Sequence, residues 1–168
     1  MCDILLTRID SELVENHDLL KKITLLFLSE NFTYPQNLSF RLEEIMENDS
    51  DSMYYLMHNE KMTDFYAIVN IFNIDVLSKR FSLSLISNDT AEKSVLSSGL
   101  KYLIELMRIH YGTTRVCSYL KDTDVKAGGI YAEIGFTREV IIPFYGWKLG
   151  GDFSLAIYSY NLTNRYEI

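Results

Sequence analysis

The chain has 168 residues, a length typical of one domain, with a net charge of −7 and 48% hydrophobic residues. That hydrophobic content supports a sizeable core and excludes a wholly disordered chain. The negative charge argues against a broad nucleic-acid-binding surface. No apolar run approaches the roughly 20 residues that cross a membrane, and the N-terminal residues lack a signal-peptide pattern. We therefore expect one domain over residues 1–168, with neither nucleic acid nor membrane as a partner.

The cysteines and histidines give no sign of a metal site. Cys2 and Cys117 lie far apart and lack metal-type spacing, which predicts free thiols in a reducing compartment, hence a cytoplasmic protein. His17, His58 and His110 are scattered along the chain. Neither a zinc-binding nor a histidine-based catalytic arrangement is visible, so we expect no metal.

The first half of the chain predicts a strand, two helices and three further strands. Asp3–Ile9 is expected to be a strand, LLKKITLLFLSENF an amphipathic helix, and FRLEEIMEN a second, short helix capped by Ser39. A turn is expected at HNEKMTD, which includes His58. The three strands are separated by short turns typical of an antiparallel meander, and are expected at Met53–Met57, Phe65–Ile74 and Arg80–Ser87.

The second half begins with the longest helix, expected from about Glu92 to His110 and ended by Gly112. Arg115–Leu120 then predicts a strand, and a strand–helix–strand unit normally has parallel strands. The last two strands are expected on either side of a Gly-Gly turn, at Thr137–Trp147 and Phe153–Tyr160. Pro143 indicates a bulge or an edge position in the first of them.

The resulting order is β-α-α-β-β-β-α-β-α-β-β. It predicts an α+β fold, with a mixed, mostly antiparallel sheet of about seven strands flanked by about four helices. Strand edges that stay exposed at the C-terminal end make a homodimer plausible.

The stretch DVKAGGIYAEIGF, Asp124–Phe136, predicts a short, rigid helix. Asp124 stands where a carboxylate caps free amides, and Gly135 stands where a left-handed C-cap is needed. Four residues at helical spacing are expected to share one buried face: Ala127, Ile130, Tyr131 and Ile134. The local pattern alone is as compatible with a simple packing helix as with a support for the Tyr131 phenol.

With this motif in this order of elements, the chain resembles the GNAT superfamily of acyl-CoA-dependent N-acyltransferases over nearly its whole length. The most specific part is Asp124-x-x-Ala127-x-x-x-Tyr131-x-x-x-Gly135-Phe136, where the family usually has Asn at the first position. The resemblance implies acetyl-CoA or another acyl-CoA as co-substrate. It gives Tyr131 the role of a general acid that protonates the departing CoA thiolate, and it places Asp124 and Ala127 among the cofactor-binding residues.

Two further segments correspond to CoA-binding parts of that family. The first turn of the long helix matches the helix N-terminus that cradles the CoA pyrophosphate, although Glu92 replaces the usual Gln or Arg and two usual glycines are absent. Contacts with the pyrophosphate are implied for Lys93, Ser94, Val95, Ser97 and Ser98. Contacts with the pantetheine arm are implied for Leu85, Ile86 and Ser87. An ordinary first turn of a helix remains the alternative for KSVLSSGL.

Three functions remain open. The first is an N-acetyltransferase in which a primary amine, on a small molecule or a protein, attacks acetyl-CoA directly. The second is a GNAT-like acyltransferase with another donor, such as an acyl carrier protein or a longer acyl-CoA, which the altered phosphate loop favours. The third is a catalytically silent GNAT-like binding domain.

The sequence singles out neither a general base nor an acceptor pocket. Carboxylates expected near the cleft are Asp64, Asp75, Asp89 and Glu133. Aromatic residues that would line an acceptor pocket are Tyr66, Tyr119 and Tyr145. Each of these residue types is also common on ordinary protein surfaces and sheets.

Overall fold

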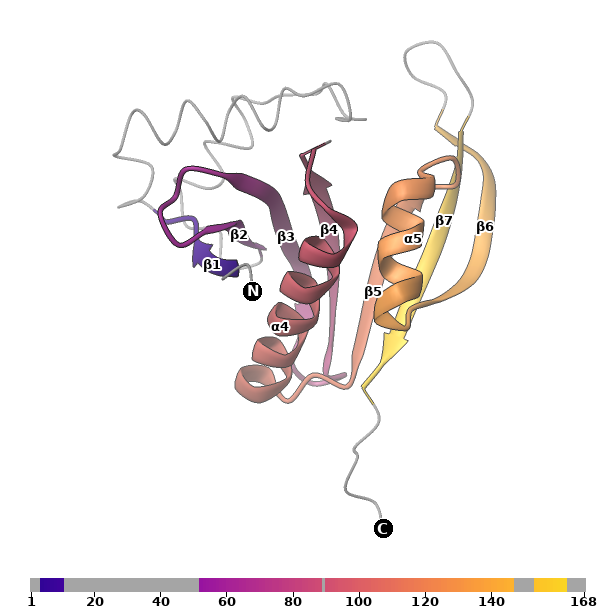
Figure 1. Cartoon of the computed structure of the whole chain (residues 1–168). Helices are drawn as coiled ribbons and strands as arrows, with labels where there is room; N and C mark the ends of the chain where they lie inside the picture. Colours follow the sequence, from indigo (N-terminus) through magenta and orange to yellow (C-terminus); the bar gives the residue numbers. More distant parts are fainter. Residues whose placement is uncertain (1–3, 11–51, 89, 147–152, 163–168) are drawn as a thin grey trace. The chain divides into compact units, whose positions relative to one another are not determined.

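The computed structural model describes residues 4–10, 52–88, 90–146 and 153–162 (Figure 1). The two helices expected before residue 51 and the Gly-Gly turn lie outside these described residues. The elements, in chain order, are β1 (Ile4–Arg8), β2 (Ser52–Asn59), β3 (Phe65–Asp75), β4 (Arg80–Ser87), α4 (Lys93–Tyr111), β5 (Arg115–Lys121), α5 (Val125–Ile134), β6 (Thr137–Gly146) and β7 (Phe153–Asn161).

The seven strands form one mixed sheet in the order β1-β2-β3-β4-β5-β7-β6. The pairs β1–β2, β2–β3, β5–β7 and β6–β7 are antiparallel, whereas β4 and β5 are parallel. The parallel pair is the one joined through α4, as the strand–helix–strand order predicts. The expected α+β fold with a mostly antiparallel sheet of seven strands is therefore confirmed.

The chain divides into two compact units, and β3, β4 and α4 contribute residues to both. The N-terminal unit comprises Met1–Phe72 and Leu85–Gly99. The C-terminal unit comprises Asn73–Ser84 and Leu100–Ile168. The expectation of a single domain over residues 1–168 stays a prediction.

The core of the N-terminal unit forms where α4 approaches the sheet. In β3 the run Ala67–Ile71 is buried at every position, so both faces of this strand are covered. A Cβ added at Gly99 of α4 would lie 2.5 Å from the Sδ and Cε atoms of Met57, a fully buried residue of β2. A larger residue at position 99 would therefore require the end of the Met57 side chain to move.

His58 lies in β2 and not in the following turn, so its expected position was wrong. The strand continues to Asn59, whose side-chain amide donates to Asp64 and thereby organises the turn that follows. The His58 ring is buried, with Nε2 2.8 Å from the Thr7 hydroxyl and Nδ1 2.6 Å from the Asn59 carbonyl. The contact with Thr7 joins β2 to β1, which is a structural role.

In the C-terminal unit, β6 ends the strand order and carries Pro143. The register of β6 against β7 shifts between Ile142 and Gly146, the interval that contains this proline. Because proline has no N–H to donate, an edge strand with an irregular register tolerates it. Both features that Pro143 indicated in the sequence are confirmed.

Candidate active site

Helix α5 has the caps that its sequence predicts. The Asp124 carboxylate accepts a hydrogen bond from the Ala127 N–H at 3.0 Å, and Gly135 adopts a left-handed conformation with φ 111°. The Phe136 N–H then donates to the Tyr131 carbonyl at 2.9 Å, which turns the chain back toward the sheet. All four residues expected on the inner face are buried: Ala127, Ile130, Tyr131 and Ile134. The predicted helix, its boundaries and its buried face are confirmed.

The Tyr131 side chain is completely buried in an aromatic cluster. Its ring centroid lies 4.9 Å from that of Phe136 and 5.9 Å from that of Tyr158. Within the described part of the chain, its hydroxyl has no hydrogen-bond partner. Burial raises the pKa of Tyr131 far above the usual 10, the Ser118 hydroxyl opposes this rise, and the charge of Asp124 adds to it. The phenol is therefore protonated at neutral pH.

Tyr158 of β7 reaches α5 because the helix has no side chain at Gly128. A Cβ at Gly128 would lie 3.0 Å from the Tyr158 hydroxyl oxygen. A glycine within a helix weakens it by about 1 kcal/mol relative to alanine, so a close contact of this kind gives the residue a packing role. The local sequence around Tyr158 does not single it out, although the Gly-Gly pair in the helical pattern of α5 was a signal for such a close approach.

Ser118 of β5 was also not selected, because a single serine in a strand carries no local signal. It is fully buried, and its hydroxyl donates to the Leu83 carbonyl of β4 at 2.9 Å. Leu83 and Ser118 form the last pair in the register of β4 with β5. Ser118 also lies directly opposite Tyr158 in the antiparallel pair of β5 and β7. Residues opposite one another in such a pair point to the same side of the sheet.

The residues expected to bind the pantetheine arm, Leu85, Ile86 and Ser87, are half-buried at the end of β4. They follow Leu83, the last residue of β4 in the register with β5. They lie beyond the segment of β4 that pairs with β5, and their role in binding the pantetheine arm stays a prediction.

The first turn of α4 contains the residues expected at the pyrophosphate. Lys93, Ser94 and Ser98 are exposed, whereas Val95 and Ser97 are buried. The Ser97 hydroxyl donates to the Lys93 carbonyl within the helix at 2.9 Å, and the Ser94 hydroxyl lies 3.4 Å from the Glu92 carboxylate. Two of the three hydroxyls therefore already have acceptors in the chain, and the role of this turn remains a prediction.

Solved structures with a similar arrangement over most of the chain include spermidine N-acetyltransferases. A chimera of the Vibrio cholerae SpeG enzyme and hSSAT superposes with a TM-score of 0.78 at 13% sequence identity, covering 95% of each chain. The V. cholerae enzyme in complex with CoA and spermine gives a TM-score of 0.75 at 11% identity, again covering 95% of each chain. The chain has the GNAT fold. No protein-family model and no curated protein sequence matches this chain.

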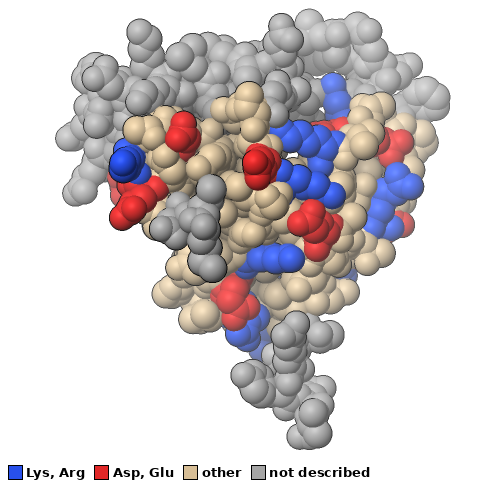
Figure 2. Space-filling view, viewed as in Figure 1, with Lys and Arg blue, Asp and Glu red and all other residues tan. Residues whose placement is uncertain are grey.

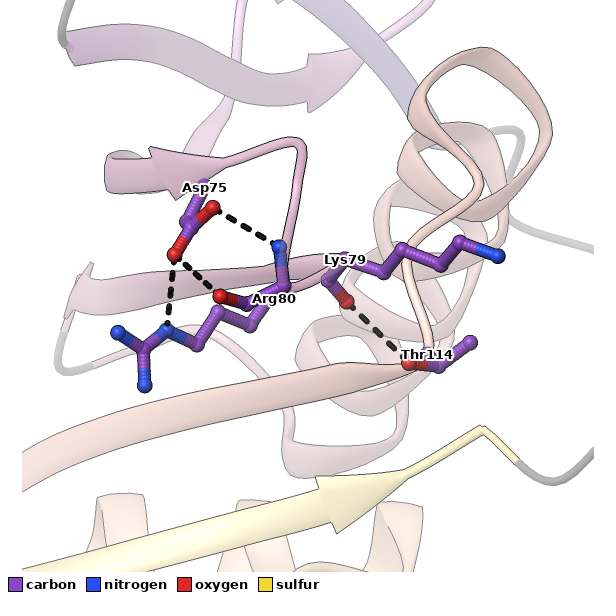
Figure 3. A network of polar contacts seen from close by, with 5 residues as sticks. Asp75, Lys79, Arg80 and Thr114 are labelled. Carbon is purple, nitrogen blue, oxygen red and sulfur yellow. Dashed lines mark hydrogen bonds and ion pairs between the residues drawn. The ribbon is translucent and has the colours of Figure 1, made fainter.

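The carboxylates considered as bases on the GNAT fold are occupied or exposed. Asp64 accepts from the Asn59 side chain at 2.7 Å. Asp75 organises the turn between β3 and β4, where it accepts from the Ser78 N–H at 2.9 Å and pairs with Arg80 at 3.5 Å (Figure 3). Hydrogen bonds from Ser78 lower the pKa of Asp75, which makes it a weaker base. Glu133 is exposed on α5, and Asp89 lies outside the described residues.

The tyrosines considered for an acceptor pocket differ in exposure. Tyr119 is exposed on β5 and Tyr66 is half-buried on β3, whereas the side chain of Tyr145 lies outside the described part. The two rings that the fold does bring to Tyr131 are Phe136 and Tyr158.

Opposite charges are interleaved on the surface. On the face in Figure 2, Lys and Arg side chains lie beside Asp and Glu side chains. All four arginines in the described part of the C-terminal unit have acidic partners, in the pairs Asp75–Arg80, Glu105–Arg108, Arg115–Glu139 and Asp122–Arg138. Exposed pairs of this kind stabilise a fold by at most about 1 kcal/mol each. They do, however, occupy guanidinium groups that would otherwise attract anions.

Within the described ranges, no three His, Cys, Asp or Glu side chains group together in a way that would hold a metal ion. Cys117, on β5, is a free thiol. None of the helices in the described ranges has the length and apolar character that a membrane span requires.

Proposed function

We propose that this protein is an N-acetyltransferase that transfers the acetyl group of acetyl-CoA to a primary amine. The observation that carries this proposal is the Tyr131 hydroxyl, which the GNAT fold buries without a hydrogen-bond partner among the described residues. A buried polar group left unpaired normally destabilises a protein by about 1–3 kcal/mol, so its retention calls for a function. A general acid for a departing thiolate is a function that fits a neutral, buried phenol.

The reaction needs no covalent enzyme intermediate. The amine nitrogen attacks the thioester carbon, the C–N bond forms, the C–S bond breaks, and CoA leaves as a thiolate. A water molecule accepts the proton that the amine loses, and Tyr131 gives its phenolic proton to the sulfur. The surroundings that raise the pKa of Tyr131 also raise the pKa of a thiol placed in them, so the sulfur is a stronger base there than in water.

The burial of the Tyr131 hydroxyl also sets a condition on how the acyl donor binds. Tyr131 has no solvent exposure, so a thioester sulfur reaches its hydroxyl only after neighbouring groups move. Donor binding is therefore expected to rearrange the surroundings of the phenol.

The proposal assigns acyl-donor binding to residues of three elements. Asp124 and Ala127 cap the N-terminus of α5 through a hydrogen bond, and we assign them to the cofactor. At the end of β4, we assign the pantetheine arm to Leu85, Ile86 and Ser87. We assign the pyrophosphate to Lys93, Ser94, Val95, Ser97 and Ser98.

The acceptor in this proposal is a small cationic amine. One protein with a similar fold was solved with CoA and spermine, a polyamine. The net charge of −7 would attract a cation during diffusion to the protein. A protein amine is the less favoured acceptor, because the similar structure solved with CoA also holds spermine, a small molecule.

A second candidate function is acyl transfer from another donor, an acyl carrier protein or a longer acyl-CoA. The observation that favours it is the first turn of α4, where the Ser94 hydroxyl lies beside the Glu92 carboxylate and the Ser97 hydroxyl is bonded within the helix. A carboxylate at this helix end repels a pyrophosphate.

We further propose a cytoplasmic homodimer. Val140, Ile141 and Ile142 are consecutive exposed apolar residues on β6, the last strand of the sheet order. An edge strand with such residues is a common site of strand pairing between copies. The location rests on the free thiol of Cys117. Sedimentation of the wild type and of Ile141→Lys tests the dimer, which the lysine is expected to dissociate.

Thermal unfolding with different donors tests the function. Acetyl-CoA at 100 times its dissociation constant is expected to stabilise the protein by about 2.7 kcal/mol, and spermidine together with acetyl-CoA is expected to release free CoA thiol. No shift at millimolar acetyl-CoA would contradict the first function. A shift with acyl carrier protein or long-chain acyl-CoA instead would support the second.

A further inference from the structure

Proton donation by Tyr131 leaves a negative charge in a buried place. A phenolate without a hydrogen-bond donor is strongly disfavoured in apolar surroundings, so a phenol that acts as an acid there needs a donor in reach. Of the two rings packed on Tyr131, Phe136 has no hydrogen-bonding side chain. The hydroxyl of the other, Tyr158, lies against Gly128 of α5.

Ser118 has the properties that such a donor requires. It is completely buried, and its register position opposite Tyr158 puts it on the side of the sheet where the Tyr158 ring meets Tyr131. Its hydroxyl lowers the pKa of Tyr131, the effect of a donor that stabilises the charged form. While the phenol is neutral, this hydroxyl donates to the Leu83 carbonyl at 2.9 Å.

A serine hydroxyl can change its acceptor by rotation about the Cβ–Oγ bond, which turns its O–H from one oxygen to another. The hydrogen bond to the Leu83 carbonyl comes from a side-chain hydroxyl, so it is separate from the backbone ladder of β4 and β5, whose register ends at Leu83 and Ser118. Its transient loss therefore leaves the backbone pairing of the two strands intact.

We propose that Ser118 is a positioning residue whose hydroxyl turns from the Leu83 carbonyl to the Tyr131 oxygen as the phenol gives up its proton. The inference rests on the proposed acetyltransferase function. In this step the Tyr131 O–H bond breaks and an S–H bond forms on CoA. Ser118 keeps its proton and only exchanges one acceptor for another, and the phenolate regains a proton from solvent after the products leave.

The kinetic test uses a double-mutant cycle. Ser118→Ala is expected to lower kcat ten- to a hundredfold, the range of a hydrogen bond to a charged group, with KM for acetyl-CoA unchanged. Ser118→Thr, which keeps the hydroxyl, is expected to recover most of kcat. In the Tyr131→Phe background, Ser118→Ala is expected to have no further effect, because the phenolate is never formed.

Ser159→Ala is the matched control. Ser159 is a buried serine of β7 in the same sheet, and its hydroxyl donates to Glu139. Its loss should change thermal stability as Ser118→Ala does but leave kcat at the wild-type value. A loss of kcat in both variants would mean that the effect of Ser118 is general destabilisation, and would overturn the proposal.

A measurement without turnover makes the contact itself testable. Carbon-13 NMR of protein labelled at tyrosine Cζ resolves Tyr131 among the 12 tyrosines by the signal that disappears in Tyr131→Phe. In an alkaline titration, Ser118→Ala is expected to move the conversion of Tyr131 to its phenolate, followed by this signal, to higher pH, and Ser159→Ala is not. An unchanged titration, or additive losses in the kinetic cycle, overturns the role of Ser118. A wild type that never acetylates an amine overturns the proposed function, so the two failures are distinct.

Discussion

The resemblance to the GNAT superfamily connects two helix segments with CoA, and these segments differ in how much of the family pattern they keep. In α5, the cap at Asp124, the left-handed Gly135 and the inward Tyr131 all have the expected geometry. In the first turn of α4, a valine and a serine stand where glycines are usual, and the hydroxyls of Ser94 and Ser97 bond within the chain. The helix proposed to carry the general acid is therefore closer to the family pattern than the turn proposed to bind the pyrophosphate.

The largest effect is expected for substitution of Tyr131. Tyr131→Phe should lower kcat at least a hundredfold, because general acid catalysis contributes about 10²–10⁴, while the affinity for acetyl-CoA stays near the wild-type value. The variant should be as stable as the wild type or more so by about 1–3 kcal/mol, since it loses an unpaired buried hydroxyl. Stopped-flow turnover and thermal melts measure both. Turnover equal to that of the wild type would remove the acid role.

A substitution in the packing of α4 should have a smaller effect than Tyr131→Phe, and the effect should be on stability alone. Gly99→Ala should destabilise the protein by about 1–3 kcal/mol, because its Cβ would lie 2.5 Å from the Met57 thioether in a closed core. Urea unfolding measures the change. Ser98→Ala, on the exposed side of the same helix, is the control and should be nearly neutral. Equal stability of the two variants would show that Met57 readily makes room.

Alkaline unfolding should separate Tyr131 from exposed tyrosines. Its pKa is raised in the folded state, so the folded protein holds this proton more tightly than the unfolded chain does. The resulting stabilisation is complete below the usual tyrosine pKa of 10 and is lost as the pH rises above it. Tyr131→Phe should therefore lose less stability than the wild type between pH 9 and about pH 11. Parallel curves for both proteins would contradict the burial of the phenol.

The smallest effect is expected at the charge that precedes α4. Glu92→Gln should raise the affinity for acetyl-CoA about two- to fivefold, the worth of one exposed charge near a helix N-terminus. Calorimetric titration at low salt measures it, and Glu133→Gln, an exposed carboxylate on α5, is the control. An unchanged affinity would indicate that the pyrophosphate does not bind at this turn.

Much of the fold was predictable because its signals are local. Alternating β-branched and aromatic residues marked the strands, and β4 was predicted with its observed bounds, Arg80–Ser87. A helical repeat between Asp124 and Gly135 marked α5. His58 was misplaced because the end of β2 is set by pairing with β1 and by the Asn59 side chain, which are not local signals.

The candidate site was predictable only in part. Tyr131 was identified because its spacing from Ala127 and Gly135 follows a known motif. Its neighbours Ser118 and Tyr158 come from β5 and β7. A serine or a tyrosine in a strand has the same appearance in the sequence whether it faces a buried phenol or any other neighbouring side chain.

The sequence by itself determined the order of elements, the caps of α5 and the one phenol that its helix turns inward, because these depend on spacing and backbone preference over a few residues. Tertiary structure alone decided that the phenol has no hydrogen-bond partner among the described residues, and that the Tyr158 ring packs on it and lies opposite Ser118 in the sheet. The physical reason is that hydrogen-bond partners and burial arise from strands far apart in the chain, which only the pairing of the sheet brings together.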